Sequence, residues 1–156
     1  MVNFSNFDKS KLKITVVSIG PIRSGLEVRY GKKRLRNKGN CRFVGKMNDV
    51  VIKIDYDFSR FSRERLYRQS LHECRTYQKL RKRDKPYFAR TKSFRINGRH
   101  VEIQEFIKGK PMNSFTYPLY RTVEELFKRY KCSDLHDGNV ILRDDNNKPV
   151  IVDFGL

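Results

Sequence analysis

The order of strand-like and helix-like segments constrains the fold of this chain more than any other feature of its sequence. Most segments are short runs rich in β-branched and aromatic residues, and only two segments show helical periodicity. The strand-like runs cover residues 13–19, 26–30, 41–44, 50–54, 91–96, 99–106, 139–143 and 149–153. Asn97-Gly98 separates two of them and is a strong hairpin signal. Because strands and helices do not alternate regularly, the order predicts an α+β fold with antiparallel sheets.

One long helix is predicted over residues 62–83. Leu66, Ser70, Glu73, Tyr77 and Leu80 follow alternating spacings of four and three residues, so they share one helix face. Asp84-Lys85-Pro86 then ends the pattern. A second, short helix is predicted over residues 122–130.

Glu73 lies on the apolar face of the long helix, where a solvated carboxylate would normally be absent. A buried carboxylate needs a partner, since leaving it unpaired costs several kcal/mol. Lys53, in the middle of the apolar run Val50–Ile54, is the candidate partner. Lys53 alone is equally consistent with the solvent face of an edge strand. The pair favours a second interpretation, in which Lys53 reaches the phosphates of a nucleotide and Glu73 holds it there.

The end of the chain contains the residues best suited to phosphoryl transfer. Asp134 and Asn139 stand five positions apart, and Asp153-Phe154-Gly155 follows after two strand-like runs. Phosphoryl transfer requires carboxylates that hold magnesium, a group that orients the nucleophile, and cations over the phosphates. A polar capping loop alone would not explain this joint arrangement. A general-base role for His136, inside the loop, is an alternative, but the spacing already assigns that task to Asp134, so His136 is interpreted as a residue that orders the loop by hydrogen bonding.

These motifs, between Gly31 and Leu156, resemble the protein kinase superfamily. The loop Asp134–Asn139 is similar to that of small serine/threonine kinases encoded by lytic bacteriophages. The resemblance implies a protein-kinase-like fold. Residues 1–107 would form a small lobe, with an antiparallel sheet, one long helix and an N-terminal strand extension. Residues 108–156 would form a truncated large lobe with the catalytic loop and the DFG triplet.

The resemblance also implies an activity, ATP- and Mg²⁺-dependent phosphorylation of Ser or Thr in a host protein, in the cytoplasm of the host cell. Asp134 would be the catalytic base, and Asn139 and Asp153 the metal ligands. The other catalytic residues would be Lys53 and Glu73. Nucleotide would be bound by Gly31, Lys33, Arg36, Lys53, Glu105 and Ile107, with the backbone from Glu105 to Ile107 binding adenine.

The segment 31–40 departs from the family pattern, because most of the expected glycines are missing. Five cations stand there: Lys32, Lys33, Arg34, Arg36 and Lys38. Either they contact the phosphates directly, or the segment binds a different anionic partner.

Charge supports an alternative function. Lys and Arg outnumber Asp and Glu by 35 to 17, which gives a net charge of +18. Such a field attracts polyanions, so the alternative is a catalytically weak kinase-fold module that binds nucleic acid or an acidic host protein. A small-molecule phosphotransferase is a third hypothesis, disfavoured because such enzymes build the acceptor pocket from helices that this chain lacks.

Two further expectations concern partners. No stretch approaches the roughly 20 apolar residues of a membrane span, so no membrane association is expected. With a truncated large lobe, the last hairpin is expected to expose apolar surface, which a second copy of the chain or an activating host protein would cover.

Overall fold

The structure is a computed structural model, and it describes residues 4–18, 24–39, 42–56, 69–112, 118–133 and 135–154. The first sheet contains β1 (Leu12–Ser18), β2 (Ser24–Tyr30) and β3 (Lys33–Arg34), in that order. The second contains β4 (Arg42–Met47), β5 (Val50–Asp55), β7 (Arg99–Glu105) and β6 (Thr91–Ile96), in that order. The third contains β10 (Pro149–Ile151), β9 (Val140–Arg143) and β8 (Gly109–Pro111), in that order. Among the described residues, the α-helices are α2 (Gln69–Lys79) and α3 (Leu119–Tyr130), with short 3-10 turns elsewhere.

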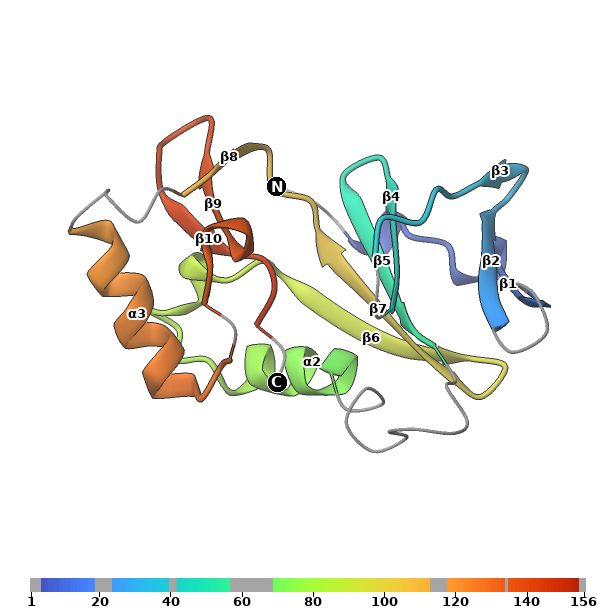
Figure 1. Ribbon diagram of the computed structural model, residues 1–156, viewed down its shortest axis with the longest axis horizontal. Helices are drawn as coiled ribbons and strands as arrows, with labels where there is room; N and C mark the ends of the chain where they lie inside the picture. The colour runs from blue at the N-terminus through green and yellow to red at the C-terminus, as the bar shows by residue number, and fades with distance from the viewer. Residues whose placement is uncertain are drawn as a thin grey trace.

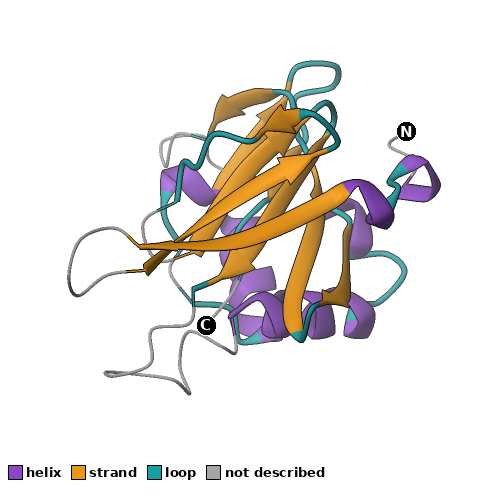
Figure 2. Ribbon diagram, turned by 90° about the vertical axis from the view of Figure 1, so that its right-hand side faces the viewer, coloured by secondary structure: helices purple, strands orange, loops and turns teal. Residues whose placement is uncertain are grey.

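The three sheets follow one another along the longest axis of the molecule. The β1–β2–β3 sheet lies at one end, and α3 with the β8–β9–β10 sheet lies at the other (Figure 1). The four-stranded sheet lies between them, and α2 runs along one side of it. Figure 2, turned by 90°, shows how much of the molecule is strand. In the part of the chain that the structure describes, neither helix is long and apolar enough to cross a membrane.

The predicted fold class, an α+β kinase-like fold with one long helix and a truncated large lobe, is wrong. The described residues are mainly β, in three antiparallel sheets. Their two helices are short and nearly equal in length, 11 residues in α2 and 12 in α3. The individual strand-like runs were located correctly, but their grouping was not. Period-2 patterns do not reveal that residues 12–34 build a sheet of their own, or that β8 adds a third strand to the last hairpin.

The long helix predicted to reach residue 83 ends earlier in the structure, because the last hydrogen bond is of the 3-10 type. α2 ends at Lys79, and the next N–H, that of Leu80, donates to the carbonyl of Tyr77 at 3.3 Å. Pro86 has no N–H and lies in a 3-10 turn, Lys85–Tyr87, so it cannot continue an α-helix. Residues 57–68, which include the predicted start of the helix, lie outside the described residues.

The apolar residues gather in two main clusters. The first lies between the β1–β2–β3 sheet and one face of the four-stranded sheet, and includes Leu12, Val28, Leu35, Phe43, Ile52, Ile54, Val101 and Ile103. The second surrounds α3 and the last hairpin, and includes Leu80, Phe88, Met112, Val123, Leu126, Phe127, Val140, Ile151 and Phe154. Among the described residues, the one exposed large hydrophobic side chain is Val16, at 53%. The apolar surface expected at the last hairpin is therefore not seen in its described part, and the homodimer stays a prediction.

The other face of the four-stranded sheet is charged, and it is also buried. Strand pairing places Lys53 between Val44 and Glu102, and Gln104 between Val51 and Thr91. Residues directly opposite each other on neighbouring strands share a face. Lys53, Glu102 and Gln104 are each at most 4% exposed, because α2 packs over them. A buried face of this kind costs desolvation energy, and it therefore marks the candidate site.

Candidate active site

The ion pair between Lys53 and Glu73 is present. Lys53 Nζ lies 2.7 Å from Glu73 Oε2, and the two side chains are 4% and 0% exposed. Nζ also donates to the carbonyl of Val152 at 3.1 Å and lies 3.6 Å from Glu102 Oε1. The ammonium thus makes two hydrogen bonds, and Glu102 lies beyond hydrogen-bond distance. The contact to Val152 brings the segment after β10 to the centre of the four-stranded sheet.

Arg42, at the start of β4, is a member of the site that the sequence reading missed. Its Nη2 donates both to Glu73 Oε1 and to Asp153 Oδ1, the latter at 2.9 Å. Arg42 is 5% exposed. The signal was present in the sequence, because a hairpin between residues 41–44 and 50–54 puts Val44 opposite Lys53. Alternation along the strand then puts Arg42 on the same face.

Glu102 is the third carboxylate of the cluster and was also missed. It lies opposite Lys53 on β7 and is fully buried. Its nearest cations among the described residues are Lys53, at 3.6 Å, and Arg42 Nη1, at 4.0 Å. Neither of its carboxylate oxygens has a hydrogen-bond partner among the described residues. A buried acceptor in this state is costly as an anion.

The charges of the cluster explain the pKa shifts. Arg42 and Lys53 supply two positive charges, and Glu73, Glu102 and Asp153 supply three carboxyl groups. Burial alone would raise the pKa of the Glu73 carboxyl, but Lys53 and Arg42 lower it to about 2. Burial, and then the negative charge of Glu73, raise the pKa of Glu102 well above its ordinary value. A protonated Glu102 leaves two cations against two anions, which is the balanced state.

Asp153 connects the buried cluster to solvent. Its side chain is 45% exposed, while burial of the remainder raises the pKa of its carboxyl. Phe154, the next residue, is fully buried and packs edge-on against Phe88, with ring centroids 5.2 Å apart. Phe154 therefore anchors the segment while Asp153 stays accessible. Asn139 lies beside this segment, since the N–H of Val152 donates to the carbonyl of Asn139 at 2.9 Å.

Asp153 and Asn139 carry the side-chain oxygens near this segment that could bind Mg²⁺ together with a nucleotide. Mg²⁺ prefers oxygen ligands, and in nucleotide sites one or two carboxylates and the phosphates hold it, with waters completing the octahedron. Among the described residues, no three His, Cys, Asp or Glu side chains are grouped in a way that could hold a metal.

Asp134 lies outside the described residues. The loop that follows it is ordered by His136, whose Nδ1 accepts a hydrogen bond from the N–H of Gly138 at 3.0 Å. The interpretation of His136 as a loop-ordering residue is therefore confirmed.

The structure does not bring the other predicted nucleotide-binding residues to the cluster. Gly31 forms the turn between β2 and β3 with φ of +59°, and Lys33 lies on β3. Both belong to the sheet at the far end of the molecule (Figure 1). Glu105 and Ile107, at and beyond the end of β7, are buried. The carboxylate of Glu105 pairs with Arg90 and Arg143, at 3.2 Å each.

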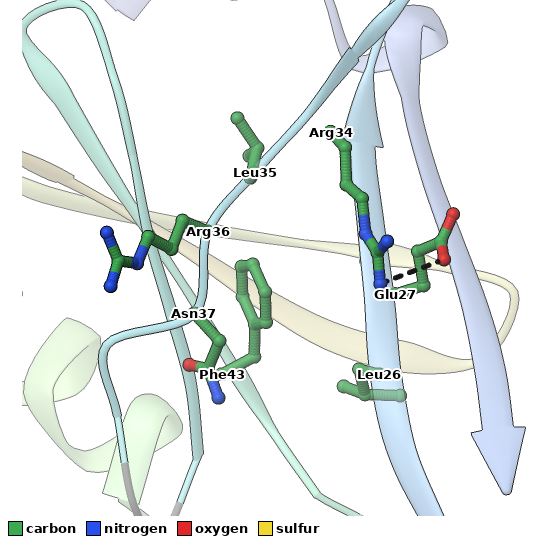
Figure 3. Close-up of a pocket in the computed structure, with 7 residues that line it drawn as sticks. All are labelled: Leu26, Glu27, Arg34, Leu35, Arg36, Asn37 and Phe43. Atoms are coloured by element: carbon green, nitrogen blue, oxygen red, sulfur yellow. Dashed lines mark ion pairs between the residues drawn. The ribbon is translucent and has the colours of Figure 1, made fainter.

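A cavity of about 350 Å³ lies between β2, the segment after β3, and β4. It is lined by Leu26, Glu27, Arg34, Leu35, Arg36, Asn37 and Phe43 (Figure 3). Arg34 pairs with Glu27 at 3.3 Å, while Arg36 points away from that pair. Phe43 is on the opposite face of β4 from Arg42, so this cavity is separate from the charged cluster.

A scan against models of protein families found no match to this chain, and neither did a search of curated proteins. The geometry of the site therefore carries the functional conclusion without support from relatives.

Proposed function

We propose that this chain transfers the γ-phosphoryl group of ATP, with Mg²⁺, to the hydroxyl of a Ser or Thr in a host protein. One observation carries the proposal. A fully buried Lys53–Glu73 ion pair is joined through Arg42 and Val152 to Asp153, a carboxylate that is half exposed. Buried, strongly coupled charges next to one accessible carboxylate are typical of functional sites. The proposed likeness to protein kinases concerns these residues and not the fold.

Each side chain has a role that its position supports. Lys53 would contact the phosphates, and Glu73 holds its ammonium in place. Asp153 and Asn139 would hold Mg²⁺, which bridges phosphate oxygens and neutralises charge that develops during transfer. Burial and the nearby negative charge of Glu73 raise the pKa of Glu102, which favours its neutral form and would reduce its repulsion of the phosphates.

Asp134 would act on the acceptor. The hydroxyl oxygen of the acceptor forms a bond to the γ-phosphorus, and the bond between that phosphorus and the β,γ-bridging oxygen breaks. The hydroxyl proton passes to the carboxylate of Asp134, and ADP leaves with the bridging oxygen.

The contacts of Lys53 impose a requirement on nucleotide binding. Its ammonium donates to Glu73 and to the carbonyl of Val152, whereas Glu102, at 3.6 Å, lies beyond hydrogen-bond distance. A phosphate oxygen would therefore accept from the N–H that is not used by these two partners, or replace the carbonyl of Val152. The contact to Glu73 would be kept, because at 2.7 Å it is the shortest.

The test is a transfer assay with γ-labelled ATP and extracts of a candidate host cell as acceptor. Wild-type protein should label protein Ser or Thr with Mg²⁺ present and should not do so in EDTA. The Asp134→Ala variant should reduce labelling by two or more orders of magnitude, since general-base catalysis contributes about 10²–10⁴-fold. Labelling that continues in EDTA, or at the wild-type rate in Asp134→Ala, would contradict the proposal.

An ordered row of exposed cations favours a second function, binding of nucleic acid. Lys32, Lys33, Arg34, Arg36 and Lys38 are all exposed. The buried side chain of Leu35 anchors the segment between them. The Asn37 side chain accepts from the N–H of Val44 at 2.9 Å and donates to the Tyr56 hydroxyl at 2.6 Å. Lys33 and Arg34 lie on β3, which pairs with β2, and the contacts of Asn37 hold the following residues beside β4.

Neutralising four of these cations, in a Lys32→Gln, Lys33→Gln, Arg36→Gln, Lys38→Gln variant, should weaken binding of duplex DNA and flatten its salt dependence. Each phosphate contact contributes about 0.9 to the slope of log K against log salt, so a loss of roughly 3 to 4 is expected. The matched control neutralises four exposed lysines elsewhere: Lys79, Lys82, Lys108 and Lys110. An equal loss in the control would mean that only net charge matters. Equally tight binding of polyglutamate would indicate an acidic protein partner instead.

A further inference from the structure

Arg42 is built into the candidate site more deeply than a stabilising surface arginine would be. Its guanidinium contacts three elements at once: Glu73 on α2, Glu102 on β7, and Asp153 after β10. Arg42 and Asp153 are separated by 111 positions in the sequence. Glu73 in turn pairs with Lys53. Arg42 therefore links the proposed phosphate-binding lysine, through Glu73, to the proposed metal-binding carboxylate of Asp153.

Only one oxygen of Asp153 is used by Arg42. The contact is to Oδ1, at 2.9 Å, while 45% of the side chain remains exposed. A hydrogen bond of this kind fixes the rotamer of the carboxylate and leaves its exposed side available to a metal ion. Partners that orient a metal ligand typically change metal affinity or activity by 10–100-fold when they are removed.

We infer that Arg42 is a positioning residue that holds Asp153 in the orientation in which it binds Mg²⁺ with the nucleotide. This inference rests on the proposed function. Lysine cannot replace Arg42 here, although it keeps the charge. The shorter reach and single ammonium of lysine do not reproduce a guanidinium that spans Glu73, Asp153 and the Glu102 side of the cluster.

The experiment measures nucleotide binding and not turnover. Binding of a fluorescent ATP analogue is titrated with Mg²⁺ in wild type and in Arg42→Lys, and is repeated in EDTA. Arg42→Lys should raise the half-saturating Mg²⁺ concentration by about 10- to 100-fold. Affinity in EDTA should stay within about twofold of wild type, because the Lys53–Glu73 pair is retained.

The matched control is Arg129→Lys. Arg129 lies on α3, which Figure 1 shows at the opposite end of the molecule from β1, and its Nη1 contacts the buried carboxylate of Asp84 at 3.1 Å, outside the charged cluster. It should not change the Mg²⁺ dependence. The inference is overturned if Arg42→Lys behaves like this control, binds Mg²⁺ more tightly, or weakens binding equally with and without metal. If wild type itself binds no nucleotide with Mg²⁺, the proposed function has failed instead.

A second measurement avoids the variant, in case Arg42→Lys is not folded at the assay temperature. In wild type labelled with ¹⁵N-arginine, a guanidinium signal should shift when ATP and Mg²⁺ are added together, and not when ATP is added in EDTA. If no guanidinium signal distinguishes these two states, the inference is overturned.

Discussion

Replacing Asp153 by Asn is expected to abolish Mg²⁺-dependent nucleotide binding and leave the fold intact. Asn keeps an oxygen that can accept the hydrogen bond from Arg42, which in wild type measures 2.9 Å. It loses the negative charge that attracts the metal. Metal ions contribute several kcal/mol of charge stabilisation, and each 1.36 kcal/mol is a factor of ten. Affinity for ATP with Mg²⁺ should therefore fall by about 100-fold or more.

Calorimetric titration with ATP, once with Mg²⁺ and once in EDTA, measures this effect. The two titrations should differ strongly in wild type and should coincide in Asp153→Asn. Asp145→Asn is the control, because Asp145 is an exposed residue in the turn of the same β9–β10 hairpin. If Asp153→Asn keeps the Mg²⁺ response or transfers phosphate as well as wild type, the assignment of Asp153 is wrong.

The second large effect is expected on stability, from Glu73→Gln. The carboxylate of Glu73 accepts from Arg42, Lys53 and Gln104, and it is fully buried. Gln keeps the shape and removes the charge, so two buried cations lose their main counter-ion. Breaking a buried ion pair by changing one partner costs about 3–5 kcal/mol. For a chain of this size that is a fall in melting temperature of roughly 6–20 °C.

The loss of stability in Glu73→Gln should depend on pH. In the folded protein the pKa of Glu73 is lowered to about 2, against an ordinary value of 4.5. Its charge therefore stabilises the fold fully above about pH 4.5, and this contribution disappears as pH falls towards 2. The contribution of Glu102 to stability changes with pH in the opposite direction. Because the pKa of Glu102 is raised in the folded protein, the folded state becomes less stable as pH rises. Glu73→Gln should thus be most destabilising at neutral pH and approach wild type in acid.

Urea unfolding followed by circular dichroism at pH 7 and at about pH 3.5 measures both effects. Glu124→Gln is the control, since Glu124 forms an exposed pair with Lys128 at 3.0 Å on α3. Exposed pairs of this kind contribute about 0.2–1 kcal/mol. A Glu73→Gln variant no less stable than Glu124→Gln at pH 7 would show that the cluster does not depend on this carboxylate.

Much of the local structure could be predicted because local rules determine it. The hairpin at Asn97-Gly98 forms with φ of 50° and 76° at its two central residues, values that these two residue types tolerate best. The last hairpin also forms where the alternating pattern placed it. The pairing of Lys53 with Glu73 was predictable for an energetic reason, since a carboxylate on an apolar helix face must find a cation.

The grouping of strands into sheets was decided only by tertiary structure. Patterns within one strand state which residues face a core but not which sheet the strand joins. For this reason the kinase-like fold class was wrong, and Gly31 and Lys33 lie in a sheet away from the charged cluster. The N–H of Gly31 donates to the carbonyl of Lys11, Lys33 pairs with Tyr30 on β2, and the N–H of the buried Leu35 donates to the carbonyl of Val28.

The sequence by itself determined the hairpins, the position of α3, and the need of Glu73 for a cation. Tertiary structure alone decided that Arg42 and Glu102 complete the cluster and that Arg42 reaches Asp153. The physical reason is range. Turn geometry and periodicity act over a few residues, whereas a buried charge is balanced by whatever groups the packed chain brings within about 4 Å of it.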